Sequence, residues 1–151
     1  MSTGAKRFTS ALRGKSLSNV WRGHGSALFL EFGRLTETRI RNGTEGESVG
    51  EVSLMIEWSW RIESRNSILG GSWSNERHWP ALFKQLVGRK VKSVELFGHL
   101  PEIAVSLSNG LRVVSFMTAD GQPSWAIIGH RPPIGSLAVK RGKLHVAANG
   151  S

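Results

Sequence analysis

Two stretches of the chain resemble each other. In each, a Gly-His pair precedes three apolar residues at alternate positions: Gly23-His24 with Leu28, Leu30 and Phe32, and Gly98-His99 with Ile103, Val105 and Leu107. Two further matches pair Ser59-Trp60-Arg61-Ile62 with Ser124-Trp125-Ala126-Ile127, and Gly71-Ser72-Trp73 with Gly135-Ser136-Leu137. Each copy of an internal repeat is one structural unit, so a repeat constrains the architecture more than a local pattern does. We therefore predict two related copies, repeat one over 12–73 and repeat two over 86–147.

Alternation of apolar and polar residues is strongest between Val52 and Ile62. The apolar face of this segment consists of Val52, Leu54, Ile56, Trp58, Trp60 and Ile62. A period of two over this length predicts one long strand with one face in a core. Trp125 takes an inward position in repeat two, and shorter runs predict strands at 28–32 and 103–107.

Turn residues divide the second copy into short strands. Asn109-Gly110 lies between two apolar runs, and both residue types tolerate positive φ, so 102–108 and 111–117 are expected to pair as an antiparallel hairpin. A turn over 120–123 precedes a strand at 124–128. Strands near 137–139 and 144–147, joined by a turn at Arg141-Gly142, complete the copy.

One segment has the period of a helix. Its apolar stripe consists of Trp79, Leu82, Phe83 and Leu86. Ser74 or Asn75 can cap its start, and Gly88 can end it. We expect a short helix near 76–87 that links the two repeats.

These patterns predict a mainly β fold, built as two related antiparallel meanders with an internal pseudo-two-fold repeat. The meanders form either a barrel or a sandwich, with the linking helix near 76–87 between them. Residues 12–148 are expected to be a single β-rich domain. The residues before them are basic, rich in Ser and free of acidic side chains. We therefore expect residues 1–11 to be a basic disordered arm.

Composition excludes several classes of protein. The chain has no cysteine, which excludes a disulfide framework, a thiolate zinc site and a cysteine nucleophile. No apolar stretch approaches the roughly 18 residues of a membrane span, and the N-terminus lacks the apolar core of a signal peptide. A cytoplasmic location fits these features.

The charge of the chain bears on its partners. Twenty Lys and Arg residues against 11 Asp and Glu give a formal net charge of +9. Positive potential attracts acidic proteins and nucleic acid alike. Exposed tryptophan beside arginine suits either a protein hot spot or base stacking. The candidate binding residues are Trp21, Arg22, Trp73, Arg77, Arg89, Lys90 and Lys92. An acidic protein surface is the favoured partner, nucleic acid is the alternative, and a dimer stays open.

Two histidines occupy equivalent positions in the repeats. His24 and His99 each follow a glycine just before a strand, and a pseudo-two-fold axis can bring equivalent loops together. Two imidazoles there could ligate a metal ion, with Glu31 or Glu102 as a further ligand. The alternative is a turn in which histidine tolerates an unusual backbone angle. Gly129-His130 is a third such pair outside the symmetry and favours the turn, so no metal or other cofactor is expected.

Catalytic motifs are absent from the sequence. There is no Gly-x-Ser-x-Gly elbow, phosphate-binding P-loop or His-Glu-x-x-His segment. Gly23-x-Gly25 lacks the third glycine and the following helix of a dinucleotide site. The sequence therefore names no catalytic residue and favours a protein that is not an enzyme.

The order of motifs in the chain is Gly14-Lys15-x-Leu17, an alternating strand, a hairpin, Ser-Trp-x-Ile and Gly-Ser-Trp. This order resembles small β-rich bacterial families of unknown function, which include immunity and accessory proteins. The resemblance implies a bacterial, intracellular binding module that acts through surface complementarity. Departures from the repeat, namely the polar loop at 42–48 and the segment from Trp73 to Trp79, are the places where a specific site is expected.

Overall fold

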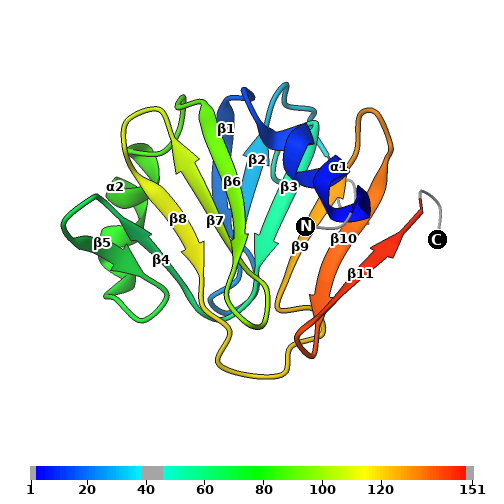
Figure 1. Cartoon of the computed structure of the whole chain (residues 1–151). Coiled ribbons are helices and arrows are strands. Elements are labelled where there is room, and N and C mark those ends of the chain that lie inside the picture. The colour runs from blue at the N-terminus through cyan, green and yellow to red at the C-terminus, as the bar shows by residue number, and fades with distance from the viewer. Residues whose placement is uncertain (1–2, 39–45, 149–151) are drawn as a thin grey trace.

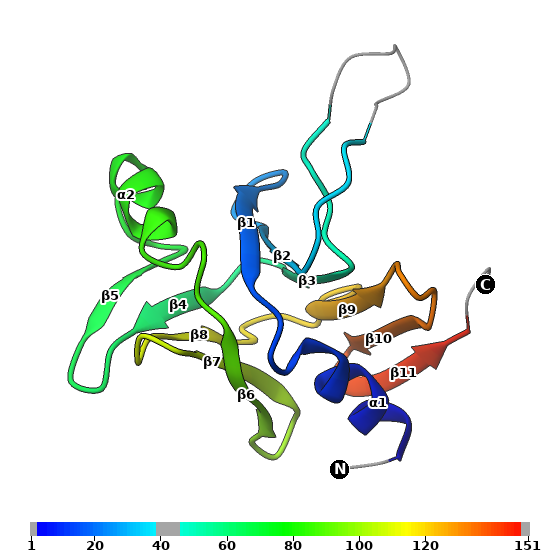
Figure 2. The same ribbon diagram turned by 90° about the horizontal axis from the view of Figure 1, so that it is seen from above.

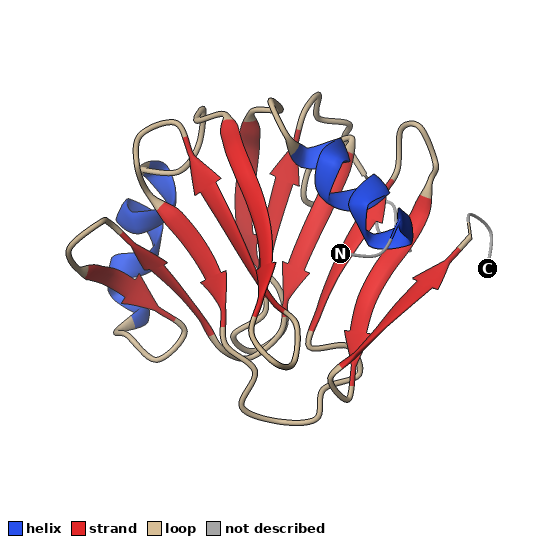
Figure 3. Cartoon of the chain, in the orientation of Figure 1, coloured by secondary structure: helices blue, strands red, loops and turns tan. Residues whose placement is uncertain are grey.

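The computed structural model describes residues 3–38 and 46–148, which form eleven strands and three short helical elements (Figures 1 and 3). In chain order these are α1 (Thr3–Leu12), β1 (Leu17–Arg22), β2 (Leu28–Phe32), β3 (Val52–Ile56), β4 (Trp60–Glu63), β5 (Ile68–Gly71), η1 (Glu76–His78), α2 (Trp79–Lys84), β6 (Val91–Phe97), β7 (Glu102–Leu107), β8 (Arg112–Ser115), β9 (Trp125–Gly129), β10 (Gly135–Lys140) and β11 (Lys143–Ala147). The mainly β class predicted from the sequence is confirmed.

The strands form two antiparallel sheets. Sheet I has the order β1-β2-β3-β9-β10-β11, and sheet II has the order β5-β4-β8-β7-β6. The sheets are not closed into a barrel, which settles the choice between barrel and sandwich in favour of the sandwich. Seen from above, the strands of the two sheets stand on opposite sides of the molecule, with β1 and β6 at the junction (Figure 2).

The two halves of the chain have the same topology, apart from β11, which has no counterpart in the first half. The first half comprises α1 and β1–β5, and the second comprises η1, α2 and β6–β11. Each half builds a three-stranded meander in one sheet and then sends its next strand to the other sheet, so that β4 pairs with β8 and β9 pairs with β3. The β1–β2 and β6–β7 pairs share one register, with a bulge after Leu17 in the first and after Val91 in the second. An internal pseudo-two-fold therefore relates the halves.

The pseudo-two-fold axis passes close to an isolated antiparallel bridge between Ser16 and Lys90, which occupy equivalent positions. Hydrogen bonds around this bridge occur in equivalent pairs: Gly14 N–H to Val91 O (2.9 Å) with Gly88 N–H to Leu17 O (2.7 Å), and Leu17 N–H to Arg89 O (2.7 Å) with Val91 N–H to Lys15 O (2.8 Å). Backbone pairing thus joins the edges of the two sheets and places the basic residues around Lys15 and Lys90 at one end of the molecule.

One of the three sequence matches does not survive as a structural equivalence. Arg61 and Ala126 are equivalent, and they pair with Gly71 and Ala138 respectively. Gly71 therefore corresponds to Ala138, and not to Gly135 three residues earlier. The match is one of residue type only, because Gly71 ends strand β5 whereas Gly135 begins strand β10.

The predicted single strand over 52–62 is wrong. It is two strands, β3 in sheet I and β4 in sheet II, separated by Glu57, Trp58 and Ser59. Trp58 has φ of +69° and is 45% exposed, so it does not face the core as predicted. The backbone reverses its direction at this residue, yet Ile56 and Trp60 on either side both point inward. Because the crossing preserves the alternation, the pattern alone cannot reveal the break.

The helices also differ from expectation. The segment expected as a disordered arm, 1–11, forms α1 over Thr3–Leu12, with Ala5, Phe8 and Leu12 fully buried. The predicted linking helix near 76–87 is present as η1 and α2, with the Asn75 side chain accepting from Arg77 N–H. Each helix precedes a glycine with positive φ, Gly14 or Gly88, and then the first strand of its half. The second helix is therefore the counterpart of α1.

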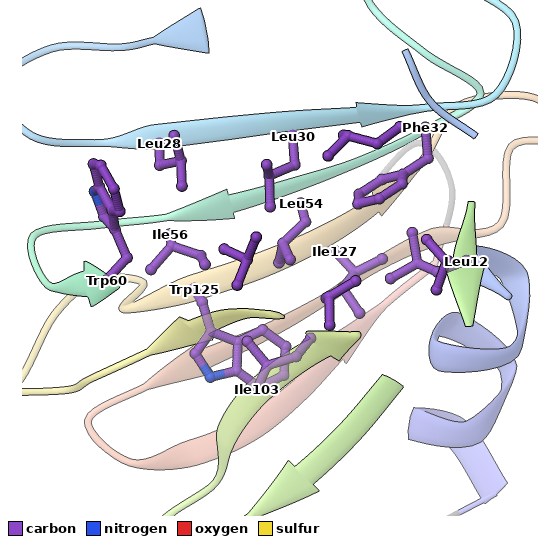
Figure 4. Packing of buried hydrophobic residues seen from close by; sticks show 14 of the residues in the cluster. Leu12, Leu28, Leu30, Phe32, Leu54, Ile56, Trp60, Ile103, Trp125 and Ile127 are labelled. Atoms are coloured by element: carbon purple, nitrogen blue, oxygen red, sulfur yellow. The ribbon is translucent and has the colours of Figure 1, made fainter. Parts of the chain in front are cut away.

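The core fills the space between the sheets and the helices. Side chains from both halves contribute to it, as Figure 4 shows. The fully buried members with large side chains include Phe8, Leu12, Leu28, Phe32, Leu54, Ile103 and Trp125. Trp60 and Trp125 take equivalent inward places, and their indole N–H groups donate to Ser26 O (2.7 Å) and Pro101 O (2.9 Å). Both tryptophans predicted as core at these positions are thus buried with their polar atoms satisfied.

Candidate functional site: the outer face of sheet II

A polar row of side chains crosses the outer face of sheet II. Neighbouring strands pair Ser93 with Ser106, Ser106 with Arg112, and Arg112 with Glu63. Together with Arg65 and Lys92 these residues line a pocket of about 480 Å³, here called the cationic pocket. Residues at one register position of four antiparallel strands lie on one face, so strand pairing alone collects this set.

Positive charge dominates this pocket. Glu63 accepts from Arg61 Nε at 2.8 Å and lies 3.2 Å from Arg112 Nε, so both of its oxygens are engaged. Within the described residues, Arg65 and Lys92 form no ion pair. Three lining cations, Arg65, Lys92 and Arg112, therefore stand against one carboxylate, which leaves a net charge of +2.

A second pocket, the aromatic pocket, lies beside the first on the same sheet. It has a volume of about 530 Å³, and its lining includes Arg61, Ile68, Trp73 and Phe116. Trp73 is 84% exposed, Ile68 67% and Phe116 50%. The Arg61 guanidinium lies over the Phe116 ring, 5.4 Å from its centre, in a cation–π contact.

The Arg61–Glu63 ion pair joins the two pockets, because Arg61 lines the aromatic pocket and Glu63 lines the cationic one. Their combined surface is apolar and aromatic at one end and cationic at the other. Such a surface can hold an extended ligand that carries an apolar group and a negative charge.

The equivalent face of sheet I is closed. Glu31 on β2 is only 1% exposed, and its carboxylate accepts from Trp21 Nε1 (2.8 Å), from Gly50 N (3.1 Å) and from the Ser53 hydroxyl. Trp21 in turn stacks on Phe29, with ring centres 4.1 Å apart. A buried carboxylate with three donors is stabilised by its hydrogen bonds rather than exposed for chemistry.

His130 completes the Glu31 cluster. Its Nε2 lies 2.9 Å from the Ser53 oxygen. Because Ser53 donates its proton to Glu31, His130 must donate through Nε2. In a catalytic serine–histidine pair the histidine accepts the serine proton instead. The Glu31–Ser53–His130 cluster is therefore built as a buried hydrogen-bond chain, and Ser53 is not an activated nucleophile.

Two groups near this cluster have shifted pKa values. Burial lowers the pKa of His130, and the Arg131 charge lowers it further, whereas Glu31 opposes the shift. The Arg34 N–H donates to Glu51 at 2.7 Å, and this bond, with help from Lys15, holds the pKa of the Glu51 carboxyl below its usual value.

The candidate binding residues do not form one surface. Lys92 lines the cationic pocket and Trp73 the aromatic pocket. Trp21 is packed into the closed face of sheet I. Arg89 and Lys90 lie in the turn before β6, beside the pseudo-two-fold bridge.

The two remaining candidates flank the second helix. Arg22 pairs with Glu76 at 2.8 Å and lies over the Trp79 ring at 5.1 Å, so it holds the helix against β1. Arg77 is exposed on η1. Neither residue lines the cationic or the aromatic pocket.

Sequence reasoning missed Arg65, Arg112, Phe116 and Ile68. Alternation within 60–63 and 112–115 carries a usable signal, because it places Arg61, Glu63 and Arg112 on outward positions. The pairing of β4 with β8 brings these positions together, and no local pattern predicts that pairing.

His24 and His99 are both exposed in equivalent turns, β1–β2 and β6–β7. Among residues 3–38 and 46–148 there is no group of three or more His, Cys, Asp or Glu side chains placed to hold a metal ion. Of the polar loop expected at 42–48, residues 42–45 lie outside the part of the chain that the structure describes.

Comparison with known proteins finds no matching family, no matching curated protein and no matching solved structure. No helix in the described part of the chain has the length and apolar character needed to cross a bilayer.

Proposed function

We propose that this protein is a non-enzymatic binding module that takes an acidic segment of a partner protein across the outer face of sheet II. The observation that carries the proposal is the union of the cationic and aromatic pockets through the Arg61–Glu63 ion pair. An immunity or accessory role, in which the protein covers an acidic partner, suits this chemistry.

The energetics of protein interfaces support this reading of the surface. Tryptophan and arginine are enriched among the residues that dominate binding free energy, especially where they desolvate together. Trp73 is almost fully exposed and lies beside Phe116 and Ile68. Covering these side chains removes apolar area from water, and the net charge of +2 in the neighbouring pocket favours an acidic sequence next to the apolar anchor.

Nucleic-acid binding is the second candidate. It is favoured by one observation, the exposed Trp73 indole next to a cationic pocket, because bases stack on aromatic side chains while Lys and Arg neutralise phosphates. The extent of apolar surface around Trp73 favours the protein partner. Ile68 offers no stacking face and adds to an apolar anchor site instead.

Fluorescence anisotropy with two labelled probes separates the candidates. One probe is a short peptide rich in Glu that carries a single Phe, and the other is an oligo(dT) of similar charge. We expect the peptide to bind, Trp73→Ala to weaken it by about tenfold, and Lys92→Glu to weaken it while reducing its salt dependence. Leu144→Ala and Lys143→Glu, exposed changes on β11 of sheet I, are the matched controls and should leave binding unchanged.

Tighter binding of oligo(dT), with a steep loss of affinity as salt rises, would instead support nucleic-acid recognition. Absence of binding to both probes at low salt would contradict a binding role for this face.

A further inference from the structure

The cationic pocket has donors without acceptors. Its only lining carboxylate, Glu63, is engaged by Arg61 and Arg112. Within the described part of the chain, Arg65 and Lys92 form no ion pair, and the hydroxyls of Ser93 and Ser106 form no hydrogen bond. A pocket with free cationic and hydroxyl donors is complementary to an anion with several acceptor oxygens.

The pseudo-two-fold shows what occupies this position on the other sheet. Glu31 is equivalent to Ser106, Ser53 to Arg112, and His130 to Arg65. On sheet I the frame surrounds an internal anion, the Glu31 carboxylate, with donors from three directions. Sheet II lacks that carboxylate and has two arginines in place of its neighbours.

The loops that follow β2 and β7 also make the two sheet faces different, because one covers its face and the other leaves it open. Residues 33–51 join β2 to β3, and Ser48 and Gly50 of this connection bond to Asn19 and Glu31 on the face of sheet I. Only residues 108–111 join β7 to β8, as a tight turn at Asn109-Gly110. The short turn leaves the cationic pocket open to solvent where the longer connection closes its counterpart.

Charge and shape select among oxyanions. The donors belong to different elements: Lys92 and Ser93 to β6, Ser106 to β7, Arg112 to β8 and Arg65 to the β4–β5 turn. Donors on several sides suit a tetrahedral group better than a planar carboxylate. A phosphate monoester carries a charge of about −1.5 to −2 at neutral pH, which matches the pocket's net charge of +2 better than the single charge of a phosphodiester.

We propose that the cationic pocket binds the phosphate group of a phosphate monoester. This inference rests on the proposed function, because the phosphate would be the acidic group that the partner supplies. The pocket volume of about 480 Å³ exceeds the phosphate itself, so part of the group that carries it also enters. Two sources share this chemistry, a phosphorylated side chain of a protein and a small phosphorylated compound.

Isothermal titration calorimetry tests the proposal with four probes: inorganic phosphate, free O-phosphoserine, and one acidic peptide with either phosphoserine or serine at its centre. We expect phosphate-dependent binding that weakens about tenfold in Arg65→Ala, which loses a charged hydrogen bond, and less in Ser106→Ala, which keeps every charge. Arg65 is exposed and unpaired, so its loss spares the fold. Arg77→Ala, an exposed arginine outside both pockets, is the matched control.

The outcomes separate this proposal from the proposed function. Equal affinity for the phosphorylated and unphosphorylated peptides overturns the phosphate site while the acidic-partner function stands. Binding of phosphate and phosphoserine that is lost in Arg65→Ala, without binding of either peptide, supports the phosphate site and overturns the acidic-partner function. Phosphopeptide binding tighter than that of phosphoserine assigns the protein source, and equal binding assigns the small compound. Phosphate binding whose affinity is unchanged in both Arg65→Ala and Ser106→Ala overturns the site.

Discussion

Individual residues decide what each half of this molecule can do, because the backbone frame is shared. Arg112 and Ser53 stand at the same register position of β8 and β3, yet one faces an open pocket and the other a buried carboxylate. Beside sheet I, His130 occupies the position that Arg65 occupies beside sheet II. A titratable histidine in a half-buried, hydrogen-bonded place makes the stability of the closed face depend on pH.

The pH dependence of stability follows from the lowered pKa of His130. In the unfolded chain histidine titrates near pH ~6.5, and in the folded protein it titrates lower because burial disfavours its charge. Between these two pKa values only the unfolded state binds the proton. The free energy of unfolding should therefore fall as pH drops below about 6.5 and level off below the folded pKa. Urea unfolding at a series of pH values measures this.

His130→Gln is the control for that prediction, because glutamine can donate to Ser53 but does not titrate in this range. The slope between pH 6.5 and the folded pKa should flatten in this variant. An unchanged slope would assign the effect to other groups, of which Glu51, with its own lowered pKa, contributes only at more acidic pH.

At the scale of elements, α1 is the largest departure from the sequence prediction. Its apolar residues Ala5, Phe8 and Leu12 stand at i, i+3 and i+7, the stripe of an amphipathic helix. Serine, lysine and arginine between them give the segment the composition of a disordered arm. The stripe becomes decisive only once a groove beside β6, β9 and β10 exists to receive it, and that groove is formed by residues far along the chain.

Phe8→Ala tests whether α1 belongs to the folded domain. The side chain is fully buried in the common core, so the change should lower the free energy of unfolding by about 3 kcal/mol. Lys6→Ala on the exposed side of the same helix should change it by less than about 0.5 kcal/mol. Chemical denaturation of both variants measures the difference. Equal stabilities would mean that the helix contributes nothing to the core.

The strands β3 and β4 show that an alternating pattern can predict burial correctly and still miss a break between strands. Period-two alternation correctly predicted that Val52, Leu54, Ile56, Trp60 and Ile62 are buried. It did not predict that Trp58 lies in the left-handed region and carries the chain from one sheet to the other. The residue type gives no warning, because left-handed backbone is uncommon for a bulky side chain.

For the whole molecule, the internal repeat was the most informative part of the sequence. It predicted the β class, the equivalence of β2 with β7 and of β4 with β9, and the positions of most strands. It could not predict which strands of different halves would pair. Long-range pairing of β3 with β9 and of β4 with β8 creates both sheets, and the candidate site on sheet II depends on the second of these pairs.

Because each sheet contains strands of both halves, the structure predicts the effect of cleaving the backbone between the halves. Cleavage between Ser74 and Asn75, in an exposed turn, separates the halves without removing a residue. Alone, each half would expose the open edges of its third and fourth strands and half of the shared core, so neither fragment should unfold cooperatively. Mixing the fragments should restore the strand signal in circular dichroism and a single thermal transition, since every sheet pairing can form again. A fragment that unfolds cooperatively as a monomer would show instead that the repeat it contains is an independent domain.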